Sequence, residues 1–544
     1  MTTGALRFAV YALLGVVVGL IVAFLDWITL EVALHSLIEG PRWAQIVFPV
    51  LGFVAVPGLL NYWQINASTS DAYIEAYHTG SGAELEKLPK KSAANIITIA
   101  TGGAVGLEGT AVLTGATIGQ WIGDRRPDVI GKRNRLVLVV AGAAAGVASL
   151  FKAPATGVLF AMESPYRRDL SRHGLVPALI ASAAAYMTFV LIIGDERLLS
   201  DIGSEDVSVQ QGLLAAVLLG FLGAGVARAM AYTFRWAKTV AIDVSYRVRL
   251  PIAAVSTGLS VYLALELVEL PATLGPGASM VAEIVGDSNI AIGAIVGLFF
   301  LRVIATSSTL AMSGVGGLFI PLVVQGLLLG RAVELLLGAP SSGLYPVIGL
   351  AVVLGAGYRT PLAAVMFVAE TTGRAEFVIP ALIGIAISQA LMGDVSVSTG
   401  QIGERQGRLE RRLDEAASAV MIGDLGTLEP GTTLLDVIDQ YGDRPVAPAI
   451  AVADPEYKGL LVLHDVAMNI LEHGMDATAG DSMRDLPAVH EDAPAMEAAR
   501  LMNAHDTAAI AVVDKDNIPV GVVSAMSLAG LNEASMLTDI DPRA

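Results

Sequence analysis

The residue in this sequence with the clearest chemical potential is Glu108, a carboxylic acid within a glycine-rich apolar segment. Residues 102–110 read Gly-Gly-Ala-Val-Gly-Leu-Glu-Gly-Thr. An acid embedded in a membrane segment is energetically costly, so it is a functional candidate by default. When charged, the carboxylate could occupy an anion site, and when protonated it could leave that site. Glu108 is therefore predicted to be a proton-sensitive gate; the alternative is a structural acid with satisfied hydrogen bonds.

Two other segments, 66–71 and 313–321, also place glycines or small polar residues where a helix is predicted to begin. The first turn of a helix leaves about four N–H groups without partners inside the helix. These groups and the positive end of the helix dipole attract anions. No cluster of carboxylates accompanies them, so the pattern favours a small anion over a cation. Packing of small residues between helices is the alternative role for such segments.

The elements that must position these residues are membrane helices. The chain has 544 residues, of which 54% are hydrophobic and only 16% charged, and its mean hydropathy is +0.64. Helices are the default structure for apolar runs in lipid. The first run is interpreted as a retained helix and not as a signal peptide. The candidate spans are Phe8–Leu34, Trp43–Tyr62, Leu136–Met162, Val176–Ile193, Gln211–Phe234, Leu250–Leu270, Leu318–Leu337 and Val347–Phe367.

The charge of the chain is concentrated in its last part. Residues 401–544 contain 10 basic and 25 acidic side chains, which leaves 24 and 26 for the rest of the chain. This acidity argues against nucleic acid as a partner. The basic loops 124–135 and 166–173 are expected on the cytoplasmic side, together with the tail. Cysteine is absent, which excludes disulfides and thiolate metal sites, and no other metal site or catalytic constellation is predicted.

After residue 400 the pattern changes to short apolar strands alternating with amphipathic helices. Strands are predicted at 449–452 and 459–463, and the same pair recurs about sixty residues later at 509–513 and 521–524. A helix is predicted before each pair, at 434–440 and 495–502. A repeat of this length indicates two stacked copies of one small α/β unit.

The order of these motifs resembles the CLC family of chloride channels and proton/chloride exchangers, followed by a pair of CBS modules. Residues 106–110 resemble the family's GxEGP signature, with Thr110 in place of proline, and residues 317–321 match its GxFxP signature. Other blocks that resemble the family are 142–154, 160–163, 358–362 and 370–372. The resemblance covers nearly the whole chain.

The resemblance implies a role for each matching residue. Glu108 falls on the external gating glutamate. The positions where backbone amides contact chloride are Leu107, Gly109, Leu318, Phe319 and Ile320, and Phe319 also lines the path. Thr69 falls on the central serine of the family, although helix capping is an equally good explanation for a threonine there.

Besides Thr110, three positions depart from the family pattern. At Thr69 the hydroxyl is kept, but Ser68 and Ser70 replace the flanking glycines. The inner-gate tyrosine falls on Val397, where Ser396 or Ser398 could supply a hydroxyl. The inner proton-transfer glutamate falls on Ser164, directly after Glu163, which belongs either to a proton path or to a structural hydrogen bond. Without the tyrosine ring the inner constriction is expected to be wider, and without the inner acid the proton path lacks a relay.

The CBS pair carries two incomplete half-sites for an adenine nucleotide. The first copy has the acid, Asp465, without the hydroxyl, and the second has the hydroxyl, Ser524, without the acid. Nucleotide binding is therefore only weakly indicated, and no other cofactor is expected.

The sequence thus predicts an all-α polytopic membrane domain with the inverted-repeat CLC architecture, followed by a cytoplasmic α/β CBS pair. The predicted boundaries are 1–400 for the membrane domain, 401–415 for a charged linker, 416–478 and 479–535 for the CBS modules, and 536–544 for a tail. By resemblance, the protein is a homodimer in the cell membrane, in contact with lipid, and carries chloride or another small anion.

Three modes of transport remain open at this stage. The departures at Val397 and Ser164 favour channel-like or weakly coupled conduction, whereas Glu108 favours proton-coupled antiport. The third alternative is a transporter regulated by a CBS ligand, with selectivity for an anion other than chloride. An enzymatic role is not expected.

Overall fold

The computed structural model divides the chain into two compact units, Met1–Arg405 and Gln406–Ala544. It describes residues 3–81, 83–125, 135–171, 174–196, 198–199, 208–404, 412–423, 426–441, 448–474 and 476–529. The predicted tail 536–544 and the end of the second predicted CBS module lie outside these residues. So do residues 126–134 and 172–173 of the two predicted basic loops and residues 405–411 of the predicted charged linker.

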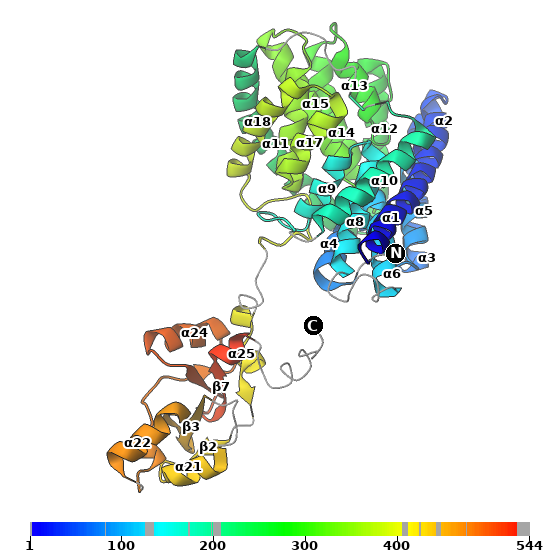
Figure 1. The fold of residues 1–544 in the computed structure, drawn as a ribbon. Coiled ribbons are helices and arrows are strands. Elements are labelled where there is room, and N and C mark those ends of the chain that lie inside the picture. The colour runs from blue at the N-terminus through cyan, green and yellow to red at the C-terminus, as the bar shows by residue number, and fades with distance from the viewer. Residues whose placement is uncertain are drawn as a thin grey trace. The chain divides into compact units, whose positions relative to one another are not determined.

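The described residues of the first unit form helices (Figure 1). Eight of these helices are long and apolar enough to cross a membrane. This confirms the predicted all-α polytopic domain. The helices are α1 (Thr3–Asp26), η1 (Trp27–Leu34), α2 (His35–Ile38), α3 (Arg42–Trp63), α4 (Ser70–Thr79), α5 (Leu88–Ala100), α6 (Glu108–Arg125), α8 (Arg135–Phe151), α9 (Pro154–Glu163), α10 (Leu175–Ile193), α11 (Val209–Asp243), α12 (Tyr246–Val268), α13 (Ala278–Gly286), α14 (Ile292–Ala311), α15 (Phe319–Leu337), α16 (Leu344–Tyr358), α17 (Pro361–Thr372), η3 (Ala375–Phe377) and α18 (Val378–Met392).

Two of the predicted continuous spans are wrong. Leu136–Met162 is broken into α8 and α9, and Val347–Phe367 into α16 and α17. Each second helix starts at a proline, Pro154 or Pro361, whose missing N–H and fixed φ suit the first helical position but not a helix interior. Two residues before each proline the backbone has a positive φ, 53° and 59°, which turns the chain sharply. The resulting short helices end inside the unit.

The first unit is built from two halves that bond to each other reciprocally. On α5, the hydroxyl of Thr98 accepts a hydrogen bond from the backbone N–H of Val315, at 3.1 Å. On α14, the hydroxyl of Thr309 accepts one from the N–H of Ala104, also at 3.1 Å. The pair α5–α6 and the pair α14–α15 therefore contact each other through equivalent atoms, as expected of inverted repeats.

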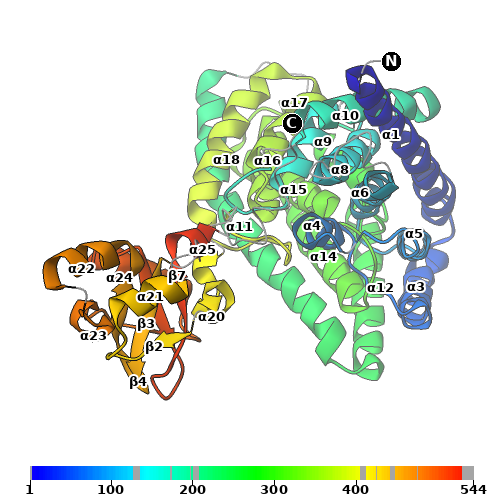
Figure 2. The same ribbon diagram turned by 60° about the horizontal axis from the view of Figure 1, so that its bottom comes forward.

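The interior of this unit contains the segments that carry the predicted site. In both views, α11 and α18 lie at one edge of the unit and α1 at the opposite edge, with α15 between them (Figures 1 and 2). Nearly every residue of α16 is buried, as is most of α15. The first turn of α15, from Phe319 to Leu322, is therefore enclosed by the rest of the unit.

The second unit is a small α/β domain, in agreement with the predicted pair of CBS modules. Its strands form two sheets with the orders β1-β7-β6-β5 and β2-β3-β4. The predicted strand 459–463 ends at Val462, because the next three residues form the 3₁₀-helix η4. The elements are α20 (Ala417–Val420), β1 (Ile422–Gly423), β2 (Thr427–Leu428), α21 (Leu434–Tyr441), β3 (Ala449–Asp454), β4 (Glu456–Val462), η4 (Leu463–Asp465), α22 (Val466–His473), α23 (Ala479–Ser482), β5 (Val489–His490), α24 (Ala495–Ala504), β6 (Ala509–Val513), β7 (Pro519–Ser524) and α25 (Ala525–Ala529).

The repeat is visible in the strand pairing. In each sheet a two-residue strand runs parallel to a longer strand, β2 with β3 and β5 with β6, and the longer strand then pairs antiparallel with the next one. The boundary between the two modules stays a prediction.

Candidate anion site

The carboxylate of Glu108 lies on the first backbone N–H groups of α15. Its Oε1 accepts hydrogen bonds from the N–H of Phe319 at 2.6 Å and of Ile320 at 3.2 Å. The side chain is only 2% exposed, and Oε2 has no hydrogen-bond partner among the residues that the structure describes. A negatively charged group therefore occupies the place where helix-start amides would hold a free anion.

Two glycines make room for this carboxylate. The loops before α6 and α15 pair through Gly106 and Gly317, whose N–H and C=O groups bond to each other at 3.0 and 2.9 Å. A Cβ at either glycine would overlap the carboxyl group of Glu108. These positions therefore require glycine for the close approach of backbone and carboxylate.

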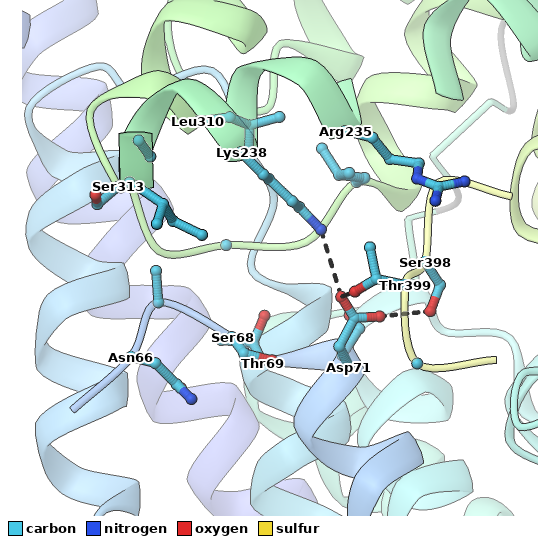
Figure 3. A pocket seen from close by; sticks show the side chains of 18 of the residues that line it. Asn66, Ser68, Thr69, Asp71, Arg235, Lys238, Leu310, Ser313, Ser398 and Thr399 are labelled. Atoms are coloured by element: carbon cyan, nitrogen blue, oxygen red, sulfur yellow. Dashed lines mark hydrogen bonds and ion pairs between the residues drawn. The ribbon is translucent and has the colours of Figure 1, made fainter. Parts of the chain in front are cut away.

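Two cavities reach the site from opposite sides of Phe319. A cavity of about 420 Å³, called here the small cavity, is lined by Leu107, Glu108 and Ile320 among others. A cavity of about 1110 Å³, called here the large cavity, is lined by Leu318 and by polar residues of α4 and α11 (Figure 3). Leu318 lines the large cavity and Ile320 lines the small one, so the barrier between the cavities lies at Phe319, the residue between them.

Thr69, the residue predicted to supply the central hydroxyl, lies at the start of α4 and lines the large cavity. It holds the N-cap position of α4, but its side chain makes no capping hydrogen bond. The side chain is 3% exposed, lines the large cavity, and touches the backbone at Gly109, where a Cβ would overlap Oγ1. Of the two explanations for Thr69, this placement favours contact with a ligand over capping by the side chain.

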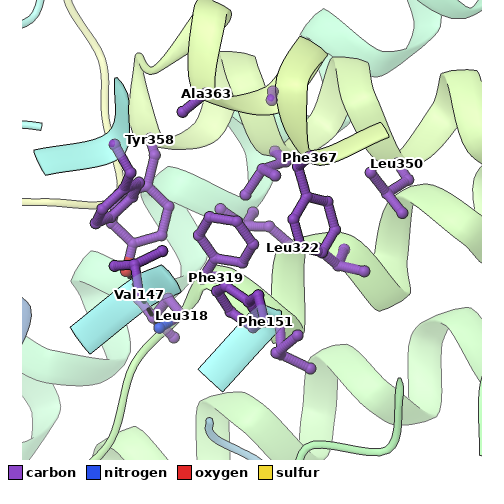
Figure 4. Packing of buried hydrophobic residues seen from close by; sticks show 14 of the residues in the cluster. Val147, Phe151, Leu318, Phe319, Leu322, Leu350, Tyr358, Ala363 and Phe367 are labelled. Carbon is purple, nitrogen blue, oxygen red and sulfur yellow. Dashed lines mark hydrogen bonds between the residues drawn. The ribbon is translucent and has the colours of Figure 1, made fainter. Parts of the chain in front are cut away.

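Tyr358 is a residue of the site that the sequence reasoning missed. Its hydroxyl accepts a hydrogen bond from the N–H of Leu318 at 3.2 Å, and its ring lies 6.3 Å from that of Phe319, centroid to centroid. Phe319 also stacks on Phe151 at 4.6 Å and meets Phe367 edge-on at 5.1 Å (Figure 4). The signal in the sequence was a hydroxyl-bearing aromatic residue directly before the break between α16 and α17.

The position predicted for the inner gate, Val397, is buried beside Tyr358. The N–H of Val397 donates to the carbonyl of Gly357 at 2.9 Å, and the hydroxyl of Ser396 donates to the same carbonyl at 3.3 Å. Ser396 is thereby engaged with backbone, whereas Val397 lines the large cavity together with Tyr358. A wider constriction was expected because Val397 has no ring. Tyr358 lines the same cavity and supplies a ring there.

The two residues considered for a proton path differ in their surroundings. Glu163 accepts from the N–H groups of Leu362 at 3.0 Å and Ala363 at 2.9 Å, so both of its oxygens bind the first turn of α17. This arrangement favours the structural alternative for Glu163. Ser164 is 2% exposed, and its Oγ has no partner within the described part of the chain.

A second carboxylate, on α17, caps the start of α9 in the same way. Glu370 of α17 accepts from the N–H groups of Ala155 at 2.9 Å and Thr156 at 2.8 Å, and from the Thr156 hydroxyl at 2.7 Å. The helices α9 and α17 therefore cap each other. Charge-assisted bonds of this kind hold both helix starts in place.

We expect Glu370→Ala to lower the free energy of unfolding by about 1–3 kcal/mol, because it leaves helix-start N–H groups without an acceptor. Thermal unfolding followed by size-exclusion chromatography would measure the change. Glu266→Gln is the matched control, since Glu266 forms an exposed ion pair with Arg42 at 3.6 Å that contributes little. Equal melting of Glu370→Ala and the control would contradict the capping role.

The two residues considered for a nucleotide are engaged within the second unit. The carboxylate of Asp465 forms an ion pair with Arg484. The hydroxyl of Ser524 accepts from the N–H of Ser527 at 3.1 Å. Each group would have to exchange its present partner for ribose or phosphate. No three His, Asp or Glu side chains come together as a metal site within the part of the chain that was searched, the described residues.

Comparisons with known proteins identify the family of this chain. The family model described as voltage gated chloride channel matches residues 51–393, and the CBS domain model matches residues 479–531. The chain is 26% identical over 408 residues to the voltage-gated ClC-type chloride channel ClcB of Citrobacter koseri, covering 71% of this chain and 95% of that protein.

Exchangers are among the similar proteins as well. The H(+)/Cl(−) exchange transporter ClcA of Yersinia pestis is 26% identical over 415 residues, covering 68% of this chain and 81% of that protein. The crystal structure of a CLC-type fluoride/proton antiporter superposes with a TM-score of 0.62 at 22% identity, covering 74% of this chain and 98% of that one. The last similarity concerns the fold alone.

Proposed function

Because this chain belongs to the CLC family of anion transporters and is a multi-pass membrane protein, we propose that it exchanges chloride for protons, with Glu108 as the protonatable gate. The observation that carries this proposal is the carboxylate of Glu108 on the N–H groups of Phe319 and Ile320. These donors can hold either the carboxylate or a chloride ion, but not both at once.

The proposed cycle alternates the occupant of these amides. Charged Glu108 blocks the passage between the two cavities. A proton that reaches it from the small cavity neutralises the carboxylate, weakens its bonds to the helix start, and lets an anion replace it. The return of the charged carboxylate expels the anion. One group thus links the movement of the anion to that of the proton, as an exchanger requires.

Tyr358 supports exchange over conduction through an open channel. Its ring and hydroxyl lie at Leu318, on the large-cavity side of Phe319, where they narrow the passage. Thr69 would supply a second hydroxyl to an anion there. Val397 was expected to leave the passage wide, but the ring of Tyr358, which comes from another segment, narrows it.

Channel-like conduction is the second candidate, because Ser164 stands where a relay acid would be expected. Purified protein in liposomes separates the two. Under an imposed chloride gradient, we expect protons to move uphill in a fixed ratio to chloride. Chloride flux without proton movement would establish the channel and reject exchange.

Other features complete the proposal. The protein would act as a homodimer surrounded by lipid, with the second unit in the cytoplasm. Ile402 lines the large cavity near the end of the first unit, so that cavity would open on the cytoplasmic side. Binding of an adenine nucleotide at Asp465 and Ser524 stays a prediction; calorimetric titration with ATP would test it.

A further inference from the structure

A second carboxylate, Asp71, lies in the large cavity and is held by donors from two distant segments. Lys238 of α11 reaches it with Nζ 3.4 Å from Oδ2. The hydroxyl of Thr399 donates to Oδ2 at 3.2 Å, and the hydroxyl of Ser398 donates to Oδ1. Figure 3 shows Lys238 extending from one side and the two hydroxyls from another, all toward Asp71. One ammonium group and two hydroxyls thus converge on one negative charge.

The two hydroxyls are positioned without the help of Asp71. Before them, the N–H of Val397 is bonded to the carbonyl of Gly357 at 2.9 Å. After them, the side-chain amide of Gln401 donates to the carbonyls of Ser164 and Tyr358, both at 2.9 Å. The segment is therefore anchored at both ends to the interior of the membrane unit. Its hydroxyls would keep their place if the carboxylate moved away.

The charges around the cluster favour a mobile anion. The basic side chains that line the large cavity are Arg235, Lys238 and Arg249, and its acidic ones are Asp71 and Glu75, with His78 beside them. Arg249 is engaged with backbone carbonyls, including that of Ala311 at 2.9 Å. Lys238 forms an ion pair with Asp71, and its side chain is 35% exposed, so an ion in the cavity can reach it.

We propose that Lys238, Ser398 and Thr399 form a second anion site in the large cavity, which the carboxylate of Asp71 occupies in place of a free small inorganic anion. This inference rests on the proposed anion transport and adds a second binding site along the path of the transported anion. Entry of an anion displaces Asp71 from the same three donors, so Lys238 keeps a negative partner throughout. The displaced carboxylate turns to the water of the cavity, to which its side chain is already 20% exposed.

On each side of the barrier at Phe319, a carboxylate of the protein occupies donors that could hold a free anion. Glu108 occupies backbone donors beside the small cavity, and Asp71 occupies side-chain donors in the large cavity. A tethered carboxylate competes at a high effective concentration, because it cannot diffuse away. Removing its charge must therefore strengthen the binding of a free anion to the donors that remain.

Calorimetric titration of the purified full-length protein with chloride tests this site. We expect Asp71→Asn to lower the Kd by about threefold or more, or to add one bound equivalent, because the tethered competitor is lost. The double variant Asp71→Asn/Lys238→Met should lose this gain. Glu75→Gln is the matched control: it removes one charge from the lining of the same cavity, on the same helix. Unchanged binding in Asp71→Asn, or an equal gain in the control, would overturn the proposal.

The single variant Lys238→Gln carries the test if Asp71→Asn does not give a folded protein. Chloride binding should then weaken by about threefold or more, since the cation of the site is gone. Unchanged binding would also reject the site. Chloride flux by the wild-type protein in liposomes is measured separately, so a failure of this inference is distinguishable from a failure of the transport function.

Discussion

Chloride flux through the Glu108→Gln variant should be independent of pH, whereas flux through the wild-type protein should rise as the pH falls. Glutamine keeps the size of the side chain but has no charge with which to hold the N–H groups of Phe319 and Ile320. While one carboxyl group titrates, the wild-type flux can change by up to about tenfold per pH unit. The variant should also move no protons against chloride. Ion-selective electrodes outside proteoliposomes measure both quantities.

Glu75→Gln provides the control for this experiment. Glu75 lines the large cavity, whereas the helix-start amides of Phe319 and Ile320 donate to Glu108. The Glu75 variant should therefore keep both the pH dependence and the proton movement. Retained pH dependence in Glu108→Gln would remove Glu108 from the gate and assign the titration to another group.

Tyr358→Ala should uncouple the two fluxes. Removing the ring opens a passage between the large cavity and Phe319, and it leaves the N–H of Leu318 without its acceptor. We expect chloride flux to rise and the number of protons moved per chloride to fall by roughly threefold or more. The lost hydrogen bond and ring contact are worth about 1 kcal/mol or more, which lowers the barrier to chloride by a factor of this size. Tyr358→Phe keeps the ring and should stay closer to the wild type.

A second substitution makes this expectation sharper. Val397 is bonded through its N–H to Gly357, the neighbour of Tyr358, and lines the same cavity. Val397→Tyr alone should add a second ring beside that of Tyr358 and so reduce chloride flux. In the double variant with Tyr358→Ala, the new ring should restore part of the coupling. Coupling in Tyr358→Ala that equals the wild-type value would refute a role for this ring in the barrier.

The parts of the site that the sequence predicted are those whose chemistry is local. Glu108 and Phe319 stand out because glycines and an apolar helix surround each of them within a few residues. The structure brings these two segments together through the pairing of Gly106 with Gly317. The general architecture followed from hydropathy, since lipid leaves the backbone few alternatives to helices.

The parts that were missed depend on contacts between distant segments. Asp71 belongs to a segment that was singled out, but its partners lie 167 residues away at Lys238 and 327 residues away at Ser398. Tyr358 was assigned to a family motif but not to the site. Its approach to Leu318 depends on the turn between α16 and α17, which the sequence did not predict. That turn also divided a run predicted as one span, as hydropathy does not register a proline at the start of a helix.

The most direct test of the central claim is a crystal structure of Glu108→Gln grown in bromide, with the anion located by its anomalous scattering. The claim is that the Glu108 carboxylate and a transported anion compete for the N–H groups of Phe319 and Ile320. We expect bromide within hydrogen-bonding distance of both N–H groups in the variant, and no bromide at these groups in the wild type. Bromide bound elsewhere in the variant, with these N–H groups holding no anion, would show that the carboxylate and the anion do not compete for one site.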